Sequence, residues 1–157
     1  MADDLTHLDE DGHVRMVDVG AKEPTDRQAT AEALVLMGEA TRDRLFAGDL
    51  PKGDALATVR LAAIQGAKRT PELVPLAHPL PIDAVTATIE QTDDGARIEV
   101  TASVTAKTGV EMEAITGAAI GAIALYDMIK GIDRGAEISS VRLLEKRGGK
   151  SGDWSRD

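Results

Sequence analysis

The sequence predicts an α+β fold, a ferredoxin-like sandwich in which helices pack on one face of a mostly antiparallel sheet. Three observations support this prediction: two helical stretches in the first half of the chain, a hairpin in the middle, and a long apolar helix followed by a final strand. The chain has 157 residues, which fits one domain with a sizeable hydrophobic core.

Two helices are predicted in the first half of the chain. The first covers residues 29–46, where apolar side chains recur at helical spacing after a capping-box pattern formed by Thr25 and Gln28. The second begins after Asp54, its expected N-cap, and runs through Lys68. Both helices would place an apolar face against the sheet.

The middle of the chain predicts an irregular loop and then strands. Residues 70–81 contain four of the six prolines, which favours a stiff loop. Residues 84–90 and 96–105 are strand-like, and residues 92–95 between them have the composition of a hairpin turn. A further strand is predicted at residues 137–146.

The longest predicted helix covers residues 110–132. Its middle is apolar on nearly every side, which predicts a central, buried helix. Gly117 and Gly121 lie four residues apart and would let another backbone approach closely.

The ends of the chain have little periodicity. Residues 1–12 are acidic and are expected to form a mobile leader, and residues 147–157 a flexible, lysine-bearing tail. Residues 13–19 alternate weakly, so they predict either a short strand or an extended arm.

The composition excludes several classes of function. With no cysteine, the chain has no disulfide, thiol nucleophile or cysteine–metal site. A net charge of −9 and only 2% aromatic residues argue against nucleic-acid binding. We expect no membrane association and a cytoplasmic location, because the acidic N-terminus lacks a signal-peptide pattern and the longest apolar run is too short to span a bilayer. A core of small aliphatic side chains would gain stability from oligomerisation.

His78 is a candidate for proton transfer. It lies in a proline-rich segment, Pro75-Leu76-Ala77-His78-Pro79, which fixes its backbone and leaves its side chain free. The alternative is a loop histidine that bonds a carbonyl group. No two histidines have metal-ligand spacing, so no metal site is predicted.

Two lysine-containing segments suggest anion binding. Lys52-Gly53-Asp54 places an ammonium group beside the amides of a helix N-terminus, although a solvated lysine at a helix start is the simpler interpretation. The tail segment from Gly148 to Ser151 resembles part of a phosphate-binding loop, but Leu144 stands where that motif needs glycine, so we reject an ATPase.

The long helix carries further candidates at both ends. Asp127 and Lys130 share one face; they form either an ordinary surface ion pair or a partly buried pair with shifted pKa values. Glu113 lies fourteen residues before Asp127, about 21 Å along a helix. One small substrate cannot touch both within one chain, so a site that uses both must include a second subunit.

Five segments together resemble the MoaC family of cyclic pyranopterin monophosphate synthases. They cover nearly the whole chain in order and with matching spacing: MVDV at Met16–Val19, KGDALATVRLAAIQGAKRT at Lys52–Thr70, LVPLAHPL at Leu73–Leu80, KTGVEMEAITGAAIGAIALYDMIK at Lys107–Lys130 and VRLLEKRGGKSGDW at Val141–Trp154. The resemblance implies a ferredoxin-like subunit in a homohexamer, a trimer of dimers with sites between subunits. It also implies a cyclic dihydro-GTP substrate in molybdenum cofactor biosynthesis, converted by a lyase to cyclic pyranopterin monophosphate and pyrophosphate.

The resemblance also implies roles for individual residues. Asp127, Lys130 and Lys52 would be catalytic. Substrate contacts would come from Leu76, Ala77, His78, Met112 and Glu113, and phosphate contacts from Arg27, Arg60, Lys68, Lys146 and Lys150. Ala77 departs from the family, in which many members have cysteine, so the thiol is not needed for the chemistry.

The residue types suit this reaction. Opening a purine ring and closing a pyran needs several proton transfers without redox change, and expelling pyrophosphate needs cations around the developing charge. No cofactor is required by the sequence, although Mg²⁺ could accompany the triphosphate. Two alternatives remain open: a non-catalytic subunit that binds a nucleotide or pterin for delivery, and a structural oligomerisation domain.

Overall fold

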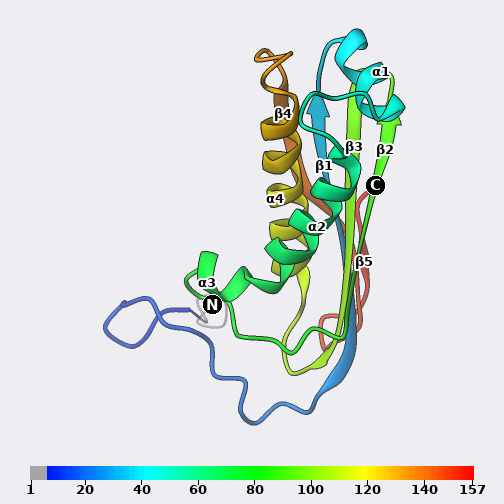
Figure 1. The fold of residues 1–157 in the computed structure, drawn as a ribbon. Helices are drawn as coiled ribbons and strands as arrows, with labels where there is room; N and C mark the ends of the chain where they lie inside the picture. Colours follow the sequence, from blue (N-terminus) through cyan, green and yellow to red (C-terminus); the bar gives the residue numbers. More distant parts are fainter. Residues whose placement is uncertain (1–6) are drawn as a thin grey trace.

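A computed structural model describes residues 7–157 as a five-stranded antiparallel sheet with helices packed on one side (Figure 1). The strands lie in the order β2-β3-β1-β4-β5. The central order of elements, strand–helix–strand–strand–helix–strand with β1 between β3 and β4, is the ferredoxin-like topology that the sequence predicts. The elements are β1 (Thr25–Leu36), α1 (Glu39–Ala47), α2 (Ala55–Lys68), α3 (Thr70–Leu73), β2 (Ala84–Thr92), β3 (Gly95–Ala106), α4 (Glu111–Ile129), β4 (Glu137–Arg147) and β5 (Trp154–Ser155).

The predicted first helix is wrong over most of its length. Residues 25–36 form β1, which pairs with β3 on one side and with β4 on the other, and a helix begins only at Glu39. Along β1, alanines at every second position face the helices, while Thr30 and Glu32 on the opposite face are also buried. A strand buried on both faces loses the polar alternation that marks a strand in sequence.

The remaining predicted elements are confirmed. Asp54 caps α2, because its side chain accepts a hydrogen bond from the main-chain nitrogen of Ala57 at 3.0 Å. The hairpin β2–β3 turns at Asp93 and Asp94. The proline-rich loop contains one short helix, α3, that the sequence does not predict.

The core lies between the sheet and the antiparallel pair α2 and α4. The prediction of a close approach at the α4 glycines is confirmed: a Cβ atom added at Gly117 would lie 3.0 Å from the carbonyl oxygen of Ala63 on α2. On the other side of the same contact, a Cβ atom added at Gly66 of α2 would lie 2.7 Å from Cβ of Ile120 on α4. Small side chains therefore bring the two helix backbones together.

Helix α4 is long and apolar enough to cross a membrane by length and composition, with a mean hydropathy of 1.4. In this fold, however, 56% of that stretch is buried inside the molecule. It is the core helix of the domain.

The two ends of the described chain differ in how much regular secondary structure they contain. The expected mobile leader falls partly on residues 1–6, which lie outside the described residues; beyond them Leu8 bridges Val14, and residues 15–19 run as an arm without regular structure. At the other end, the tail contains a strand that the sequence does not predict: Trp154 and Ser155 pair with the end of β4.

Candidate active site

Three residues at one end of α4 form a compact charged cluster. Asp127 is in the last turn of α4, Lys130 follows that helix, and Lys52 comes from the loop before α2. The Lys52 ammonium donates to the carbonyl oxygen of Asp127 at 2.6 Å and to its Oδ2 atom at 3.0 Å. Nζ of Lys130 lies 2.7 Å from Oδ1. The carboxyl end of the helix dipole also favours these two cations.

This cluster holds its charges firmly. The hydrogen bond from Lys130, followed by that from Lys52, lowers the pKa of Asp127, and the same bond to Asp127 raises the pKa of Lys130. The side chains of Asp127 and Lys130 are 54% and 50% exposed, so the single chain does not bury the pair, although both pKa values are shifted. A lysine with a raised pKa serves as a cation or a proton donor rather than as a base.

A cavity of about 410 Å³ lies at the opposite end of α4. The sequence-predicted contacts converge on it: Leu76, Ala77 and His78 from the proline-rich loop, and Met112 and Glu113 from the first turn of the helix. The rest of its lining is His7, Val17, Val19, Lys22, Leu80, Thr108, Gly109 and Glu111.

Glu113 is the buried acid of this cavity, with 2% of the residue exposed. Burial raises its pKa from 4.5 to about 7, and the neighbouring charge of Glu111 acts in the same direction. A carboxyl group with a pKa near neutrality can both give and take a proton, which suits general acid–base chemistry.

His78 has one ring nitrogen fixed by a hydrogen bond. Its Nε2 atom lies 2.7 Å from the carbonyl oxygen of Val17, which can only accept. Nε2 therefore carries the proton, and in the neutral ring Nδ1 is the basic atom. The ring does bond a carbonyl, as the simpler interpretation expected, but it also lines the cavity.

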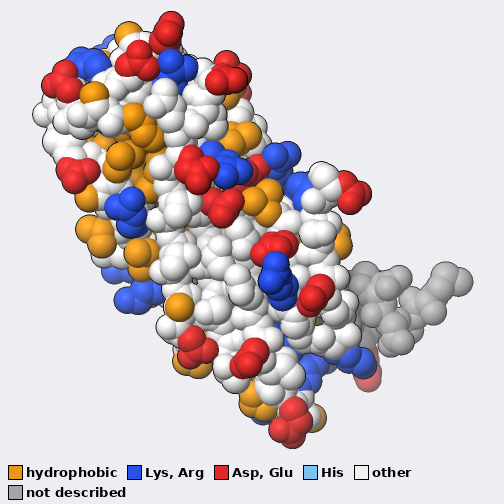
Figure 2. Space-filling view, turned by 90° about the vertical axis from the view of Figure 1, so that its right-hand side faces the viewer, with side chains coloured by type: hydrophobic (Ala, Val, Ile, Leu, Met, Phe, Trp, Pro, Cys, Tyr) orange, Lys and Arg blue, Asp and Glu red, His pale blue; other side chains and the backbone are white. Residues whose placement is uncertain are grey.

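A second, larger cavity of about 840 Å³ adjoins the first, since Lys22 and Thr108 line both. Its charged lining consists of four cations and one carboxylate: Lys22, Arg27, Lys107, Lys150 and Glu23. On the face of the molecule shown in Figure 2, by contrast, acidic and basic side chains are interspersed. The cavity thus concentrates positive charge in a chain of net charge −9.

Arg27 is held rigidly in this second cavity. Its Nε donates to the carbonyl oxygen of Ala106 at 3.0 Å and its Nη2 to that of Lys107 at 3.3 Å. Gly149 packs against it, because an added Cβ atom there would lie 2.3 Å from Nη1. Lys146, a predicted phosphate contact, is not among the residues that line this cavity; its Nζ is hydrogen-bonded to Ser151 of the lining and lies 3.6 Å from Oε1 of Glu111.

Two predicted phosphate contacts lie elsewhere in the chain. Arg60 on α2 donates from Nε to the carbonyl oxygen of Ala87 on β2 at 3.2 Å. Lys68 lines a third cavity of about 260 Å³ beside the start of β2, which shares Leu80 with the smaller site cavity. Conversely, the sequence reasoning missed Lys22 and Lys107; the only sign was that Lys107 begins one of the family-like segments.

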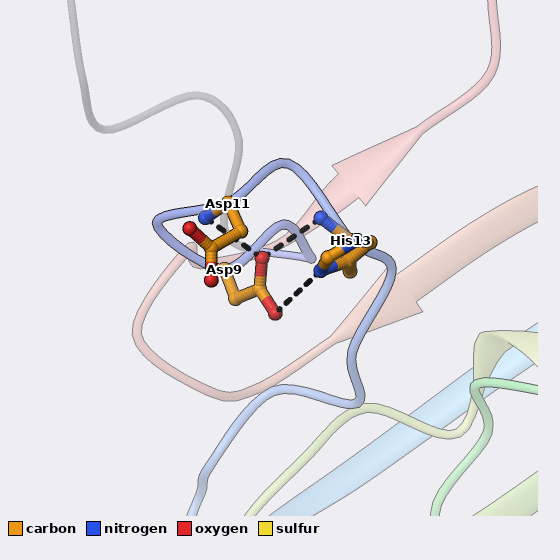
Figure 3. A group of neighbouring side chains, drawn as sticks. All are labelled: Asp9, Asp11 and His13. Carbon is orange, nitrogen blue, oxygen red and sulfur yellow. Dashed lines mark hydrogen bonds and ion pairs between the residues drawn. The ribbon is translucent and has the colours of Figure 1, made fainter.

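Asp9, Asp11 and His13 place three potential metal-binding atoms within 4.8 Å of one another (Figure 3). Oδ1 of Asp9 accepts hydrogen bonds from the main-chain nitrogens of Asp11 at 3.0 Å and His13 at 2.8 Å. These bonds are those of an aspartate-stabilised turn, which accounts for the grouping without a metal ion.

Comparison with known proteins places this geometry in a family. The family model described as "MoaC family" matches residues 16–149, which include both cavities' main walls and the lysine–aspartate cluster. The chain belongs to the MoaC family. It is 52% identical over 152 residues to a protein of Corynebacterium efficiens, covering 97% of this chain and 98% of the relative.

Other MoaC relatives also match this chain over nearly their full length. The Roseiflexus sp. (strain RS-1) protein is 52% identical over 156 residues, covering 98% of this chain and 99% of its own. The Novosphingobium aromaticivorans protein is 48% identical over 151 residues, covering 96% of each. All three relatives bear the name cyclic pyranopterin monophosphate synthase.

Proposed function

We propose that this MoaC-family chain is a cyclic pyranopterin monophosphate synthase of molybdenum cofactor biosynthesis. It would act as a lyase that converts (8S)-3',8-cyclo-7,8-dihydroguanosine 5'-triphosphate, a GTP-derived substrate, to cyclic pyranopterin monophosphate and pyrophosphate. The observation that carries the proposal is the pair of adjoining cavities, one with proton-transfer groups and the other cationic. Full-length relatives of that name support it.

The two cavities match the two halves of this substrate. The ring system, which must be rebuilt by proton transfers, would occupy the cavity that contains Glu113 and His78. The triphosphate would extend into the neighbouring cavity, where Arg27 and Lys150 stabilise the charge that develops as pyrophosphate leaves. We propose no resident cofactor; Mg²⁺ would enter with the triphosphate.

The lysine–aspartate cluster requires an assembly in this proposal. Asp127 lies fourteen residues after Glu113 on the same helix, α4, which is about 21 Å of helix rise. We propose a homohexamer, a trimer of dimers, in which Lys52, Asp127 and Lys130 of one subunit complete the cavity of its partner. The enzyme would work in the cytoplasm, where its nucleotide-derived substrate forms.

The direct test is incubation with the cyclic dihydro-GTP substrate, with pyrophosphate and the pterin product measured together. Wild type should release both in equal amounts. Lys52→Ala and Lys130→Ala should fold normally and make no product, because each removes a cation from the half-exposed cluster. Arg42→Ala removes a cation from α1 whose partners are Asp43 and the hairpin carbonyl of Asp93, not the loop that carries Lys52, and serves as the control.

Two results would contradict the proposal. Turnover near the wild-type rate by both lysine variants would remove those lysines from the chemistry. Tight substrate binding by wild type without pyrophosphate release would instead favour a delivery subunit, which needs the cavities but no proton-transfer groups.

A further inference from the structure

A stretch of chain without regular structure forms one wall of the candidate site. We call residues 16–22, which lead into β1, the strap. Val17, Val19 and Lys22 of the strap line the smaller cavity, and Lys22 also lines the larger one. In Figure 1 the strap is the blue segment that passes beneath the lower ends of the helices before entering the sheet.

The strap has few hydrogen bonds of its own. Lys22 donates from its main-chain nitrogen to Val19 at 3.1 Å, and Gly20 donates to Oδ1 of Asp18 at 2.8 Å, so these bonds stay within the strap. Among the described residues, no main-chain hydrogen bond joins the strap to a helix or strand. Its position therefore depends on side chains from the body of the protein.

Two side chains of the body bind the strap. His78 donates to the carbonyl oxygen of Val17 at 2.7 Å, and Nζ of Lys107 donates to that of Gly20 at 2.7 Å. Lys107 follows directly after β3, and its own carbonyl oxygen is held by Arg27. Lys107 thus extends from a fixed point on the sheet to the strap.

We propose that Lys107 is a positioning residue of the site: it holds the strap through Gly20 and thereby places Lys22 where the two cavities meet. The bond from an ammonium group is charge-assisted, and this type is stronger than a neutral hydrogen bond. The part of the inference that names the ligand as the cyclic dihydro-GTP substrate rests on the proposed function. The part that says Lys107 holds the strap in place rests on the hydrogen bonds alone.

A direct role as a phosphate ligand is the competing explanation for Lys107. An ammonium group has three donors, so a bond to Gly20 does not exhaust it. The two explanations predict different behaviour of the strap in the Lys107 variants when no ligand is bound. A positioning residue changes the strap in the absence of any phosphate, whereas a simple phosphate ligand leaves the strap as it is.

The absence of cysteine makes the strap easy to label at a single position. A nitroxide attached to Ala21→Cys, at an exposed position, reports strap mobility by electron paramagnetic resonance without substrate. We expect an immobilised spectrum in the otherwise wild-type protein. In Lys107→Met the mobile component should become the major one, and Lys107→Arg, which keeps charge and donors, should restore the immobilised spectrum.

Lys150→Met is the matched control, because it removes the same charge from the same cavity, whereas among the described residues only Lys107 of the two lysines forms a hydrogen bond with the strap. It should lower affinity for the substrate while leaving the label immobilised. With substrate, Lys107→Met should raise KM about tenfold, as expected for a lost charge-assisted bond, with a smaller change in kcat. If that variant does not fold, Lys107→Gln serves in the same measurements.

An unchanged spectrum in Lys107→Met would overturn the proposal, and so would equal mobility in the Lys107 and Lys150 variants. Failure of the proposed function has a different signature. Wild type would then make no product from cyclic dihydro-GTP, while the spin-label result would still stand.

Discussion

At the scale of single residues, two carboxylates on one helix show how environment sets chemistry. Glu113 is buried at the start of α4, and burial raises its pKa to about 7. Asp127 at the other end is half exposed between two ammonium groups, which lower its pKa. The first can exchange a proton near neutral pH, whereas the second remains an anion that orients cations.

Glu113 should make stability depend on pH. Its pKa is about 7 in the folded chain and near its ordinary value of 4.5 when unfolded. Between these values the folded state keeps a proton that the unfolded state releases, so stability falls as pH rises through this window. Glu113→Gln keeps the volume and cannot ionise. Its melting temperature should equal that of wild type below about pH 4.5 and exceed it increasingly up to about pH 7. A constant difference at all pH values would contradict this assignment.

The neutral form of the His78 ring should exist as a single tautomer. Because the carbonyl oxygen of Val17 accepts from Nε2, the neutral ring should carry its proton there and leave Nδ1 free to act on the ligand. Nitrogen chemical shifts of ¹⁵N-histidine-labelled protein would show this, with His78→Gln identifying the signal. A protonated Nδ1 atom in the neutral ring would contradict the observed contact with the strap.

At the scale of elements, the contact between α2 and α4 depends on glycine. An added Cβ atom at Gly66 would lie 2.7 Å from Cβ of Ile120, an atom that cannot move without its helix. Because Cβ of Ile120 cannot move aside, overpacking should cost Gly66→Ala about 2–3 kcal/mol, the upper part of the usual range, which outweighs the gain in helix propensity of about 1 kcal/mol. Gly131→Ala is the control, since nothing lies within 4 Å of its added Cβ atom. Thermal melts at one protein concentration compare the two variants, and equal melting temperatures would contradict the packing.

The elements also show what a sequence can and cannot predict. Where local chemistry decides, as at the Asp54 cap and the Asp93–Asp94 turn, the predictions are confirmed. The helix predicted over most of β1 is wrong, because Arg97 and Arg142 from the neighbouring strands cover Glu32 and bury a face that would otherwise look polar. Only the tertiary structure supplies those partners.

The same distinction applies to the candidate site. The family-like segments led to Leu76–His78 and Met112–Glu113, and the structure brings both to one cavity. Lys22 and Lys107 could not be predicted from spacing, because their roles arise where the strap crosses the end of β3. The resemblance implies a phosphate contact for Arg60, whereas in the single chain its side chain binds a carbonyl group of β2.

At the scale of the whole molecule, charge is distributed to suit an anionic ligand. The chain carries a net charge of −9, yet four cations line the larger cavity. A triphosphate would be attracted by this local field although the protein as a whole repels anions. The substrate's KM should therefore rise with ionic strength while kcat changes little, because screening weakens the attraction at about 8–10 Å and beyond. Steady-state kinetics between low and physiological salt would test this, and a KM independent of salt would contradict it.

The proposed assembly makes a prediction about mixtures of inactive variants. Lys52→Ala removes one cation of the cluster at one end of the molecule, and Glu113→Ala removes the buried acid at the other. If each site joins the cluster of one subunit to the cavity of another, co-assembly of the two variants in equal amounts leaves about a quarter of the sites intact. Co-expressed subunits should then recover about that share of wild-type turnover, whereas the separately purified variants stay inactive when assayed without subunit exchange. If each site were built within one chain, every site would carry one of the two substitutions. Co-assembly would then restore nothing, and the site would have to bridge the length of α4 within a single subunit.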